Sequence, residues 1–304
     1  MKNVLFVGDI NVDVIMGGLQ SLPVIDKEII CSSFSVAMGS SAVICAAAYA
    51  SLGGKASLLG LCGRDDYGEF MLRSMKELAI DTTRVRLTDK VRTGVTVNLI
   101  FENTRTQVTY PGTISEFDGA GVGAADFKGI SHIHFAGPYL QTKFRPELAR
   151  LLALAKSLNI TTSLDPQWDP AEKWEHMNEW LPLVTYLFVN EGEAMSLTRA
   201  TTLEDACRTL QAKTNCAVLK AGKDGSMILQ NGKIVSTPAR VVKVVDTTGA
   251  GDCFDAGFLF ATLEKGLPLP DALKIGNATG SRSCMFAGGI AHRSSYDDVL
   301  KLSQ

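Results

Sequence analysis

Two hydrophobic patterns divide the chain. From about residue 130 onward, short apolar runs are separated by stretches with helical periodicity. The runs are residues 130–135, 161–164, 186–189 and 217–220, and the helical stretches include 146–158 and 203–213. Strands that alternate with helices in this way are typical of a parallel sheet with helices on both faces. We therefore predict an α/β fold with a mainly parallel central sheet, to which the apolar run 2–8 adds a fully buried strand.

A second pattern, alternation of polar and apolar residues, occupies the N-terminal third. Residues 9–16 alternate, and so do two later runs joined by Glu102-Asn103-Thr104-Arg105, which indicates a hairpin. Alternation predicts strands with one polar face. With a further run that ends at Val36, these segments predict a small separate sheet whose strands lie at about 11–16, 29–36 and 92–112.

Helix and turn signals lie between these strands. A nearly all-small helical stretch runs through Ala50, so that helix can pack closely against the sheet. Residues 55–61 predict another strand. The turn from Gly63 to Gly68 contains Asp65, which we expect to cap a helix that ends near Leu78.

The stretch from Val244 to Phe254 (VVDTTGAGDCF) carries the clearest chemistry. A β-branched run stops at small residues, and an apolar helical pattern begins directly after them. The amides of Gly249, Ala250 and Gly251 would lack partners in the first turn of the helix, and the small side chains let an anion approach. Asp252 would be held beside that anion site. This position is costly for a carboxylate unless it abstracts a proton, so Asp252 is a candidate general base.

Packing and helix capping can also account for this stretch without an anion site. A Gly-Ala-Gly turn can serve close packing alone, and Asp252 can simply favour a helix N-terminus. A dinucleotide fingerprint is excluded because Phe254 occupies its third glycine position and no βαβ unit follows. A P-loop is excluded because the chain has no Gly-x-x-x-x-Gly-Lys-Ser/Thr.

Charge and composition narrow the possible partners. The net charge of −2 and the pI of about 6.1 suggest neither a nucleic acid nor a membrane surface as partner. No apolar run reaches a membrane span and no signal-like segment follows Met1, so the mature fold is expected to begin there. Seven cysteines without a CxxC pair predict reduced thiols and a cytoplasmic protein. With 304 residues, 46% of them apolar, the chain can bury a sizeable core.

The segment Asp246 to Phe254 resembles the C-terminal signature of the ribokinase-like (PfkB) carbohydrate kinases, and supporting motifs occur in the right order along nearly the whole chain. This resemblance implies a single kinase domain over 1–304 that transfers the ATP γ-phosphoryl group to a hydroxyl of a small sugar or polyol. It implies Asp252 as catalytic base, the Gly249–Gly251 amides as anion hole, and Mg²⁺ as cofactor. The small sheet would be a lid over the sugar and a homodimer interface, with Val95, Val97 and Leu99 at its exposed edge.

The resemblance also implies a sugar site. Asp13 would grip two hydroxyls, and Gly39 with Ser40 would contact the substrate. The family usually has an asparagine where this chain has Ile44, so the site is altered. Asp165 would touch the substrate or a phosphate-bound water, or it is only a turn residue before proline. Asp165 begins a segment in which Gln167 and Asp169 replace the usual Asn and Arg, which argues against an anionic sugar.

Further motifs imply a nucleotide site. Asn190 and Glu193 match the Asn-x-x-Glu motif that works on Mg²⁺ and phosphates, with Glu193 acting on the metal indirectly. The remaining residues implied to lie beside ATP are Lys220, Gly222, Gly225 and Asn277.

In many relatives a carboxylate before the anion hole holds potassium, together with nearby carbonyls. Here that role would fall to Asp246 and Thr248, with the loop 283–288. The alternative is that Asp246 only caps its own turn.

Two alternative functions and one possible metal site remain to be considered. A nucleoside kinase of the same fold would use Phe34 or Phe101 to stack a base. A non-catalytic sugar- or nucleotide-binding regulator has no need of Asp252 as a base. His132 and His134 share one strand face without a third ligand at a suitable spacing, so they are predicted to be packing residues rather than metal ligands.

Overall fold

The large sheet runs through the whole body of the protein. A computed structural model describes residues 2–101, 104–286, 288–289 and 293–304. In spatial order the strands of this sheet are β14 (Lys233–Thr237), β13 (Ser226–Gln230), β12 (Ala217–Lys220), β11 (Tyr186–Asn190), β10 (Thr161–Asp165), β9 (His132–Ala136), β1 (Asn3–Val7) and β4 (Lys55–Leu59). The strands from β12 to β4 pair in parallel, whereas β13 and β14 pair antiparallel at one edge. The predicted mainly parallel sheet is therefore confirmed.

Helices cover both faces of the large sheet, because successive residues of its strands are apolar and point to opposite faces. In β1, Val4 and Phe6 pack into one core and Leu5 and Val7 into the other. The first core lies under α1 (Ser41–Ser51), α8 (Ala250–Leu263), α9 (Leu269–Ser283) and α10 (Tyr296–Ser303), and the second under α4 (Leu148–Ser157), α5 (Met177–Trp180), α6 (Glu191–Thr198) and α7 (Leu203–Gln211). Short 3₁₀ helices are η1 (Arg145–Glu147), η2 (Leu181–Leu183) and η3 (Gly222–Asp224). No helix in the described ranges is long and apolar enough to span a bilayer.

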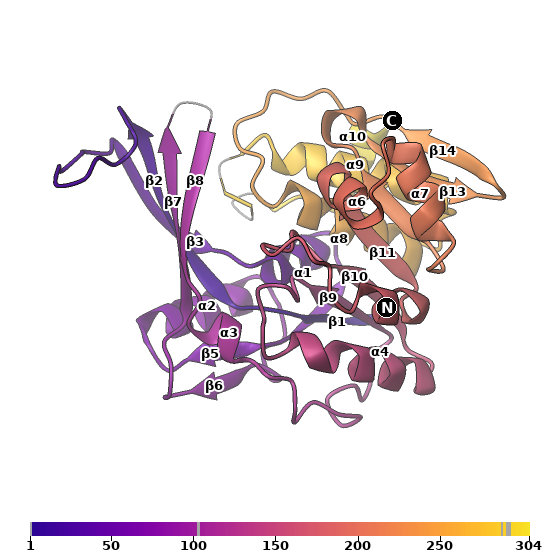
Figure 1. Cartoon of the computed structure of the whole chain (residues 1–304), viewed down its shortest axis with the longest axis horizontal. Coiled ribbons are helices and arrows are strands. Elements are labelled where there is room, and N and C mark those ends of the chain that lie inside the picture. Colours follow the sequence, from indigo (N-terminus) through magenta and orange to yellow (C-terminus); the bar gives the residue numbers. More distant parts are fainter. Residues whose placement is uncertain (1, 102–103, 287, 290–292) are drawn as a thin grey trace.

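A smaller sheet projects from this body, as Figure 1 shows. Its strands, in spatial order, are β3 (Ser33–Met38), β2 (Asn11–Leu19), β7 (Gly94–Phe101) and β8 (Thr104–Tyr110). The sheet and its hairpin agree with the lid predicted from the sequence, although the turn residues 102–103 lie outside the described residues. The predicted strand 29–36 was wrong at its start, because β3 begins only at Ser33 and Ile30 is 83% exposed in the preceding loop.

The register of the small sheet sorts its residues by face. Asp13 pairs with Thr96, which pairs with Thr109, so a polar face contains Asp13. The other face carries Val12, Val14, Val95, Val97 and Leu99, paired in neighbouring strands. Since β7 is bonded on both sides, the prediction that Val95, Val97 and Leu99 form an open edge was wrong. The outer strands are β3 and β8 instead.

Short elements connect the two sheets. The predicted strand 55–61 is divided at Gly60, where any Cβ would lie 2.5 Å from the Gly8 carbonyl oxygen. The chain continues as β5 (Leu61–Gly63), which pairs with β6 (Arg86–Thr88). The Asp65 carboxylate accepts a 2.8 Å hydrogen bond from the Gly68 amide and so caps α2 (Asp66–Glu77), as predicted. Helix α3 (Thr113–Glu116) follows β8.

Candidate active site

A pocket of about 660 Å³ lies beyond the C-terminal ends of β10, β11 and β12, where open α/β sheets bind ligands. It brings together most of the residues that the sequence selected. Those that line it are Asp165, Asn190, Glu193, Lys220, Gly222, Gly225, Gly249, Ala250, Gly251, Asp252 and Asn277. Residues from widely separated βα units therefore share one cavity, which a ligand of nucleotide size can enter.

The first turn of α8 forms one wall of this pocket. Gly249 precedes the helix with a φ of 71°, a conformation that favours glycine. A Cβ there would also lie 2.9 Å from Ile44, so the turn packs tightly on α1. The Ala250 amide donates to the Thr247 carbonyl at 3.2 Å and closes the turn, so the prediction that this amide lacks a partner was wrong. The amides of the next residues begin the helix and face the region where negative charge is favoured.

Asp252 lies in this first turn and is only 8% exposed. Its Oδ1 accepts a 3.1 Å hydrogen bond from the side-chain amide of Gln167. Burial raises the pKa of Asp252 well above its usual range, and the nearby charge of Asp165 adds to this effect, while Lys220 and a hydrogen bond with the Ser41 side chain oppose it. A carboxyl group with a raised pKa is a stronger base once it is ionised, as general-base chemistry requires.

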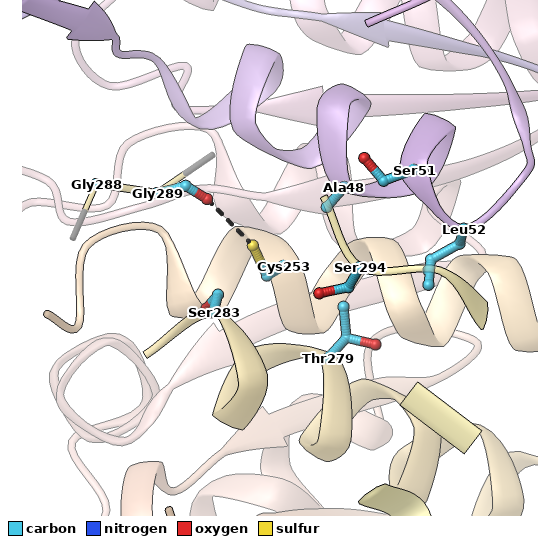
Figure 2. A pocket seen from close by; sticks show the side chains of 9 residues that line it. All are labelled: Ala48, Ser51, Leu52, Cys253, Thr279, Ser283, Gly288, Gly289 and Ser294. Atoms are coloured by element: carbon cyan, nitrogen blue, oxygen red, sulfur yellow. Dashed lines mark hydrogen bonds between the residues drawn. The ribbon is translucent and has the colours of Figure 1, made fainter. Parts of the chain in front are cut away.

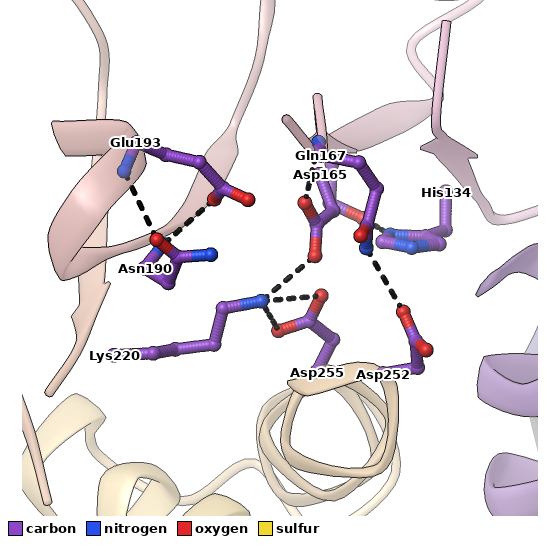
Figure 3. A network of polar contacts seen from close by, with 9 residues as sticks. His134, Asp165, Gln167, Asn190, Glu193, Lys220, Asp252 and Asp255 are labelled. Atoms are coloured by element: carbon purple, nitrogen blue, oxygen red, sulfur yellow. Dashed lines mark hydrogen bonds and ion pairs between the residues drawn. The ribbon is translucent and has the colours of Figure 1, made fainter. Parts of the chain in front are cut away.

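A buried ion-pair cluster lies beside Asp252, as Figure 3 shows. The Lys220 ammonium contacts Asp165 at 2.7 Å and Asp255 at 3.2 Å. Burial raises the pKa of Asp255 well above its usual range, whereas the charge of Lys220 offsets burial and lowers the pKa of Asp165. Asp255 was missed from the sequence. Its signal was an acidic residue inside an apolar helix pattern, one turn after Asp252.

Asn190 and Glu193 open α6 as a reciprocal cap. The Asn190 side chain accepts from the Glu193 amide at 3.0 Å, and the Glu193 carboxylate accepts from the Asn190 amide at 2.8 Å. Burial, together with the charge of Asp165, raises the pKa of Glu193 to about 7. Within the described residues, no three or more His, Cys, Asp or Glu side chains are grouped so that they could hold a metal ion.

The far wall of the pocket is built around glycines. Gly222 and Gly225 both have positive φ, at 55° and 96°, and a side chain on Gly225 would collide with the Thr237 carbonyl. The Asn277 amide donates to the Thr237 and Pro238 carbonyls at 2.9 and 3.3 Å. Asn277 thus holds the segment after β14 against α9, so its side chain shapes this wall of the pocket.

A second group of polar residues lies between the lid and the large sheet, outside the residues that line the 660 Å³ pocket. Asp13 accepts from the Asn11 side chain at 3.2 Å, and a side chain on Gly39 would collide with that Asp13 carboxylate. Ser40 caps α1, with its hydroxyl 3.3 Å from the Val43 amide. The same hydroxyl donates to the Asp9 carbonyl at 2.5 Å.

Asp9 and Asn11 were not selected from the sequence. Burial raises the pKa of Asp9 to about 6, and Asp9 interacts electrostatically with both Asp13 and Asp252. Asp9 lies between β1 and β2, and Asn11 is the first residue of β2. The polar and apolar alternation marked both residues only as candidates for a polar face.

Comparison with known proteins identifies the family. Residues 1–293 match the description "pfkB family carbohydrate kinase". The chain belongs to the pfkB family of carbohydrate kinases. It is 29% identical over 285 residues to an ATP-dependent ribose-1-phosphate kinase of Halopiger xanaduensis, with 92% of this chain and 91% of that protein covered. It is 27% identical to the ribokinase of Bacillus subtilis, with 99% and 100% covered.

The fold agrees with that membership. The crystal structure of the Methanocaldococcus jannaschii nucleoside kinase, an archaeal member of the ribokinase family, superposes with a TM-score of 0.83 at 24% identity, covering 100% of this chain and 98% of that one. The predicted ribokinase-like fold is confirmed. The activity of this pfkB kinase is therefore ATP-dependent phosphorylation of a sugar or nucleoside.

Two departures from the pfkB pattern have structural explanations. Ile44 is buried at 4% exposure and packs on the Gly249 turn, so it supports the anion hole rather than the acceptor. Asp169 accepts from the amides of Ala171, Lys173 and Trp174 at 2.8–3.0 Å. Asp169 is buried and orders its own loop. The arginine usual at this position would carry a positive charge there instead.

Asp246 connects the anion-hole turn to the loop after α9. Its Oδ1 accepts from the amide and hydroxyl of Thr248 at 2.9 and 2.7 Å, and its Oδ2 accepts from the Gly288 amide at 2.8 Å. Figure 2 shows the neighbouring contact, in which Cys253 donates to the Gly289 carbonyl beside a cavity of about 20 Å³. That cavity has room for about one water.

The histidines of β9 are core residues, as predicted. His132 bonds the Thr161 and Ser163 hydroxyls, and His134 bonds Ser163, all at 2.8 Å. Burial lowers the pKa of His132 to about 3 and that of His134 to about 4. Both rings are therefore neutral at physiological pH, and hydroxyls satisfy these ring nitrogens.

Proposed function

We propose that this protein transfers the γ-phosphoryl group of ATP to a hydroxyl of a small sugar or polyol, as one kinase domain over residues 1–304. The observation that carries this proposal is the position of Asp252. It stands at the start of α8, lines the 660 Å³ pocket, which we assign to ATP and call the nucleotide pocket, and interacts electrostatically with Asp9 on the lid side. Each of the seven cysteines has a free thiol, which supports a cytoplasmic location.

The chain's own residues divide the work as follows. Asp252 takes the proton from the attacking hydroxyl, while the N-terminus of α8 stabilises charge on the transferring phosphoryl group. Asp13 and Gly39 place the acceptor, and Ser40 fixes the start of α1 beside it. On the nucleotide side, Gly222, Gly225 and Asn277 leave room for ATP.

Mg²⁺ would be held through Glu193 and Asn190, with water and phosphate oxygens completing its coordination. When bound, the ion neutralises phosphate charge. Asp165 and Lys220 act by setting the charge at the floor of the pocket, because their side-chain groups pair with each other.

The test is a screen for ADP release. Purified protein with MgATP is offered neutral sugars, sugar acids, sugar phosphates and nucleosides, with Asp252→Asn as the inactive reference. We expect acceptor-dependent ADP release from at least one sugar or polyol. Release that is the same with and without every acceptor, or that Asp252→Asn retains, would contradict the proposal.

Neither of the two lid aromatics selected from the sequence, Phe34 and Phe101, supports a nucleoside as acceptor. Phe34 pairs with Met16, and Phe101 follows Ile100 in β7, so both lie on the sheet face opposite Asp13. They cannot stack a base above Asp13, and the alternative in which these aromatics do so was wrong in its choice of residues. A non-catalytic regulator is disfavoured because burying Asp252 without a chemical role is costly.

Asp13→Ala is expected to raise the acceptor KM by about 10-fold or more, the scale of a lost hydrogen bond to a charged group. The KM for ATP should change little, because Asp13 is absent from the residues that line the nucleotide pocket. Initial rates over a grid of both substrates measure the two constants. Asp89→Ala, which removes an exposed carboxylate after β6, is the control. An unchanged acceptor KM would remove Asp13 from the site.

A homodimer through the lid is proposed from its exposed apolar face. Phe34, Val108 and Tyr110 are 64%, 60% and 50% exposed and belong to the outer strands β3 and β8. Apolar surface of this kind favours association. We expect a dimer in sedimentation at micromolar concentration and a monomer after Phe34→Glu with Val108→Glu. Leu158→Glu, at the end of α4, is the control, and a monomeric wild type would refute the interface.

A monovalent cation is proposed beside Asp246 and Thr248. Their contacts tie the anion-hole turn to Gly288, so a cation there would order the turn without touching ATP. Residue 287 of the predicted 283–288 loop lies outside the described residues. Turnover is expected to rise when potassium replaces tetramethylammonium at fixed ionic strength and saturating Mg²⁺. Equal rates in the two salts would leave Asp246 as a purely structural residue.

A further inference from the structure

The first residues after β10 form a contact with Asp252 that the proposed mechanism does not use. Gln167 stands where related kinases have asparagine, and its Nε2 donates to Asp252 Oδ1 at 3.1 Å (Figure 3). An Asp carboxylate has two oxygens. The Gln167 amide holds Oδ1, and the Ser41 side chain also interacts with this carboxylate, so these two donors fix how Asp252 faces the acceptor region.

The backbone of Gln167 is fixed, so the direction of its side chain is constrained as well. Its φ is 56°, and its amide donates to Asp165 Oδ1 at 3.0 Å. The other oxygen of Asp165 is paired with Lys220 at 2.7 Å. One residue thus connects the buried ion pair to Asp252 through its own main chain and side chain.

The space around Gln167 is also defined. A Cβ on Gly137 would lie 3.8 Å from both the Gln167 side chain and the Asp9 carboxylate. Because Gly137 has no side chain, the space between the Gln167 side chain and the Asp9 carboxylate stays open at the ends of β9 and β10. Gln167 therefore lies at the junction of the acceptor region and the nucleotide pocket, where it can orient Asp252 toward the acceptor.

The charges near Asp252 explain why a neutral donor is useful there. The charged or titratable groups that face it are Asp165 from β10, Lys220 from β12, Asp9 after β1, Cys45 from α1 and, on α8 itself, Cys253 and Asp255. Carboxylates outnumber the single ammonium in this set, so Asp252 is pushed toward its protonated form. An amide N–H stabilises the carboxylate without adding another charge.

We propose that Gln167 is a positioning residue that fixes the orientation of the Asp252 carboxylate toward the acceptor hydroxyl. This proposal rests on the proposed function, in which Asp252 is the base. Gln167 need not touch the substrate, and no bond to it forms or breaks in the reaction.

The test uses Gln167→Met, which keeps the length of the side chain and removes the donor. We expect kcat to fall about 10- to 100-fold, the scale of one hydrogen bond to a charged group, with the acceptor KM little changed. Loss of the donor raises the pKa of Asp252. Since the ionised form is active, the acidic limb of the kcat/KM profile should move to higher pH. Lys173→Ala, on the same loop, is the control and should change neither quantity.

A double-mutant cycle separates this role from a general structural one. In the Asp252→Asn background, Gln167→Met should cause no further loss of turnover, because its effect passes through the carboxylate. Circular dichroism confirms that each variant is folded, and Gln167→Glu is the second variant, expected to move the acidic limb further still.

Several results would overturn the proposal. These are an unchanged kcat and acidic limb in Gln167→Met, a raised acceptor KM with the acidic limb in place, or a full additional loss in the Asp252→Asn background. Wild-type turnover in Asp252→Asn alone is a separate outcome. It would overturn the proposed function, and the two failures are therefore distinguishable.

Discussion

Asp252→Asn should lower turnover by about 10²- to 10⁴-fold, the usual contribution of a general base. The asparagine side chain has the same shape and can still contact Gln167, but it cannot accept the proton of the attacking hydroxyl. The fold should be retained, because burial already disfavours the charged form of Asp252. Steady-state ADP release with saturating ATP and acceptor measures the effect, and thermal unfolding checks the fold.

A matched control separates the base from a helix-start effect. Asp66 also lies in the first turn of a helix, α2, but it is not buried. Asp66→Asn removes a charge from a similar position relative to a helix dipole and should leave turnover unchanged. If Asp252→Asn kept turnover near that of Asp66→Asn, proton abstraction by Asp252 would be excluded.

Lys220→Met should destabilise the fold by about 3–5 kcal/mol, the cost of removing one partner of a buried ion pair. The Lys220 side chain is 11% exposed, and the side chains of Asp165 and Asp255 are 1% and 0% exposed. The substitution leaves two buried carboxylates without their cation. Urea unfolding followed by fluorescence gives the free energy of unfolding of each variant.

The same substitution at the surface provides the control. Lys143 and Glu116 also approach to 2.6 Å, but their side chains are 53% and 42% exposed. Lys143→Met should therefore cost no more than about 1 kcal/mol. Equal losses for the two variants would show that the buried cluster contributes no more than an exposed pair.

The pH dependence of the Lys220→Met deficit has a definite sign. Without the ammonium, both buried carboxyl groups have folded-state pKa values above their unfolded values, because burial disfavours the charged form. Stability from such groups is present at low pH and is lost as pH rises. The deficit relative to wild type should thus be larger at pH 8 than at pH 5.

Local patterns predicted most of the fold. Apolar runs placed the parallel strands within one or two residues, and alternation placed the lid strands, because these signals depend only on which faces of a strand are buried. The predicted start of β3 was wrong because Ile30 lies in an exposed loop. An apolar residue in such a loop does not indicate a buried strand face. The choice of Val95, Val97 and Leu99 as an open edge failed because sheet order depends on pairing between distant segments.

The site was predicted as a set of residues, without their contacts. Asp252, Glu193 and Gly249 share one cavity, as the order of motifs implied. Asp9 was missed because a single acidic residue after a strand has no local signal for burial, and Asp255 was missed although it interrupts an apolar helix pattern, because that pattern does not reveal its partner. Only contact with Lys220 and proximity to Asp252 distinguish them from surface carboxylates.

The sequence by itself determined the α/β fold, the lid, the family and the candidate base, because each depends on periodicity or on a contiguous motif. The tertiary structure alone decided which partner each charged group has. Lys220 lies 55 positions from Asp165, and Gln167 lies 85 positions from Asp252. Charge pairing and pKa shifts depend on distance and burial, and these arise only when separate βα units meet at the same end of the sheet.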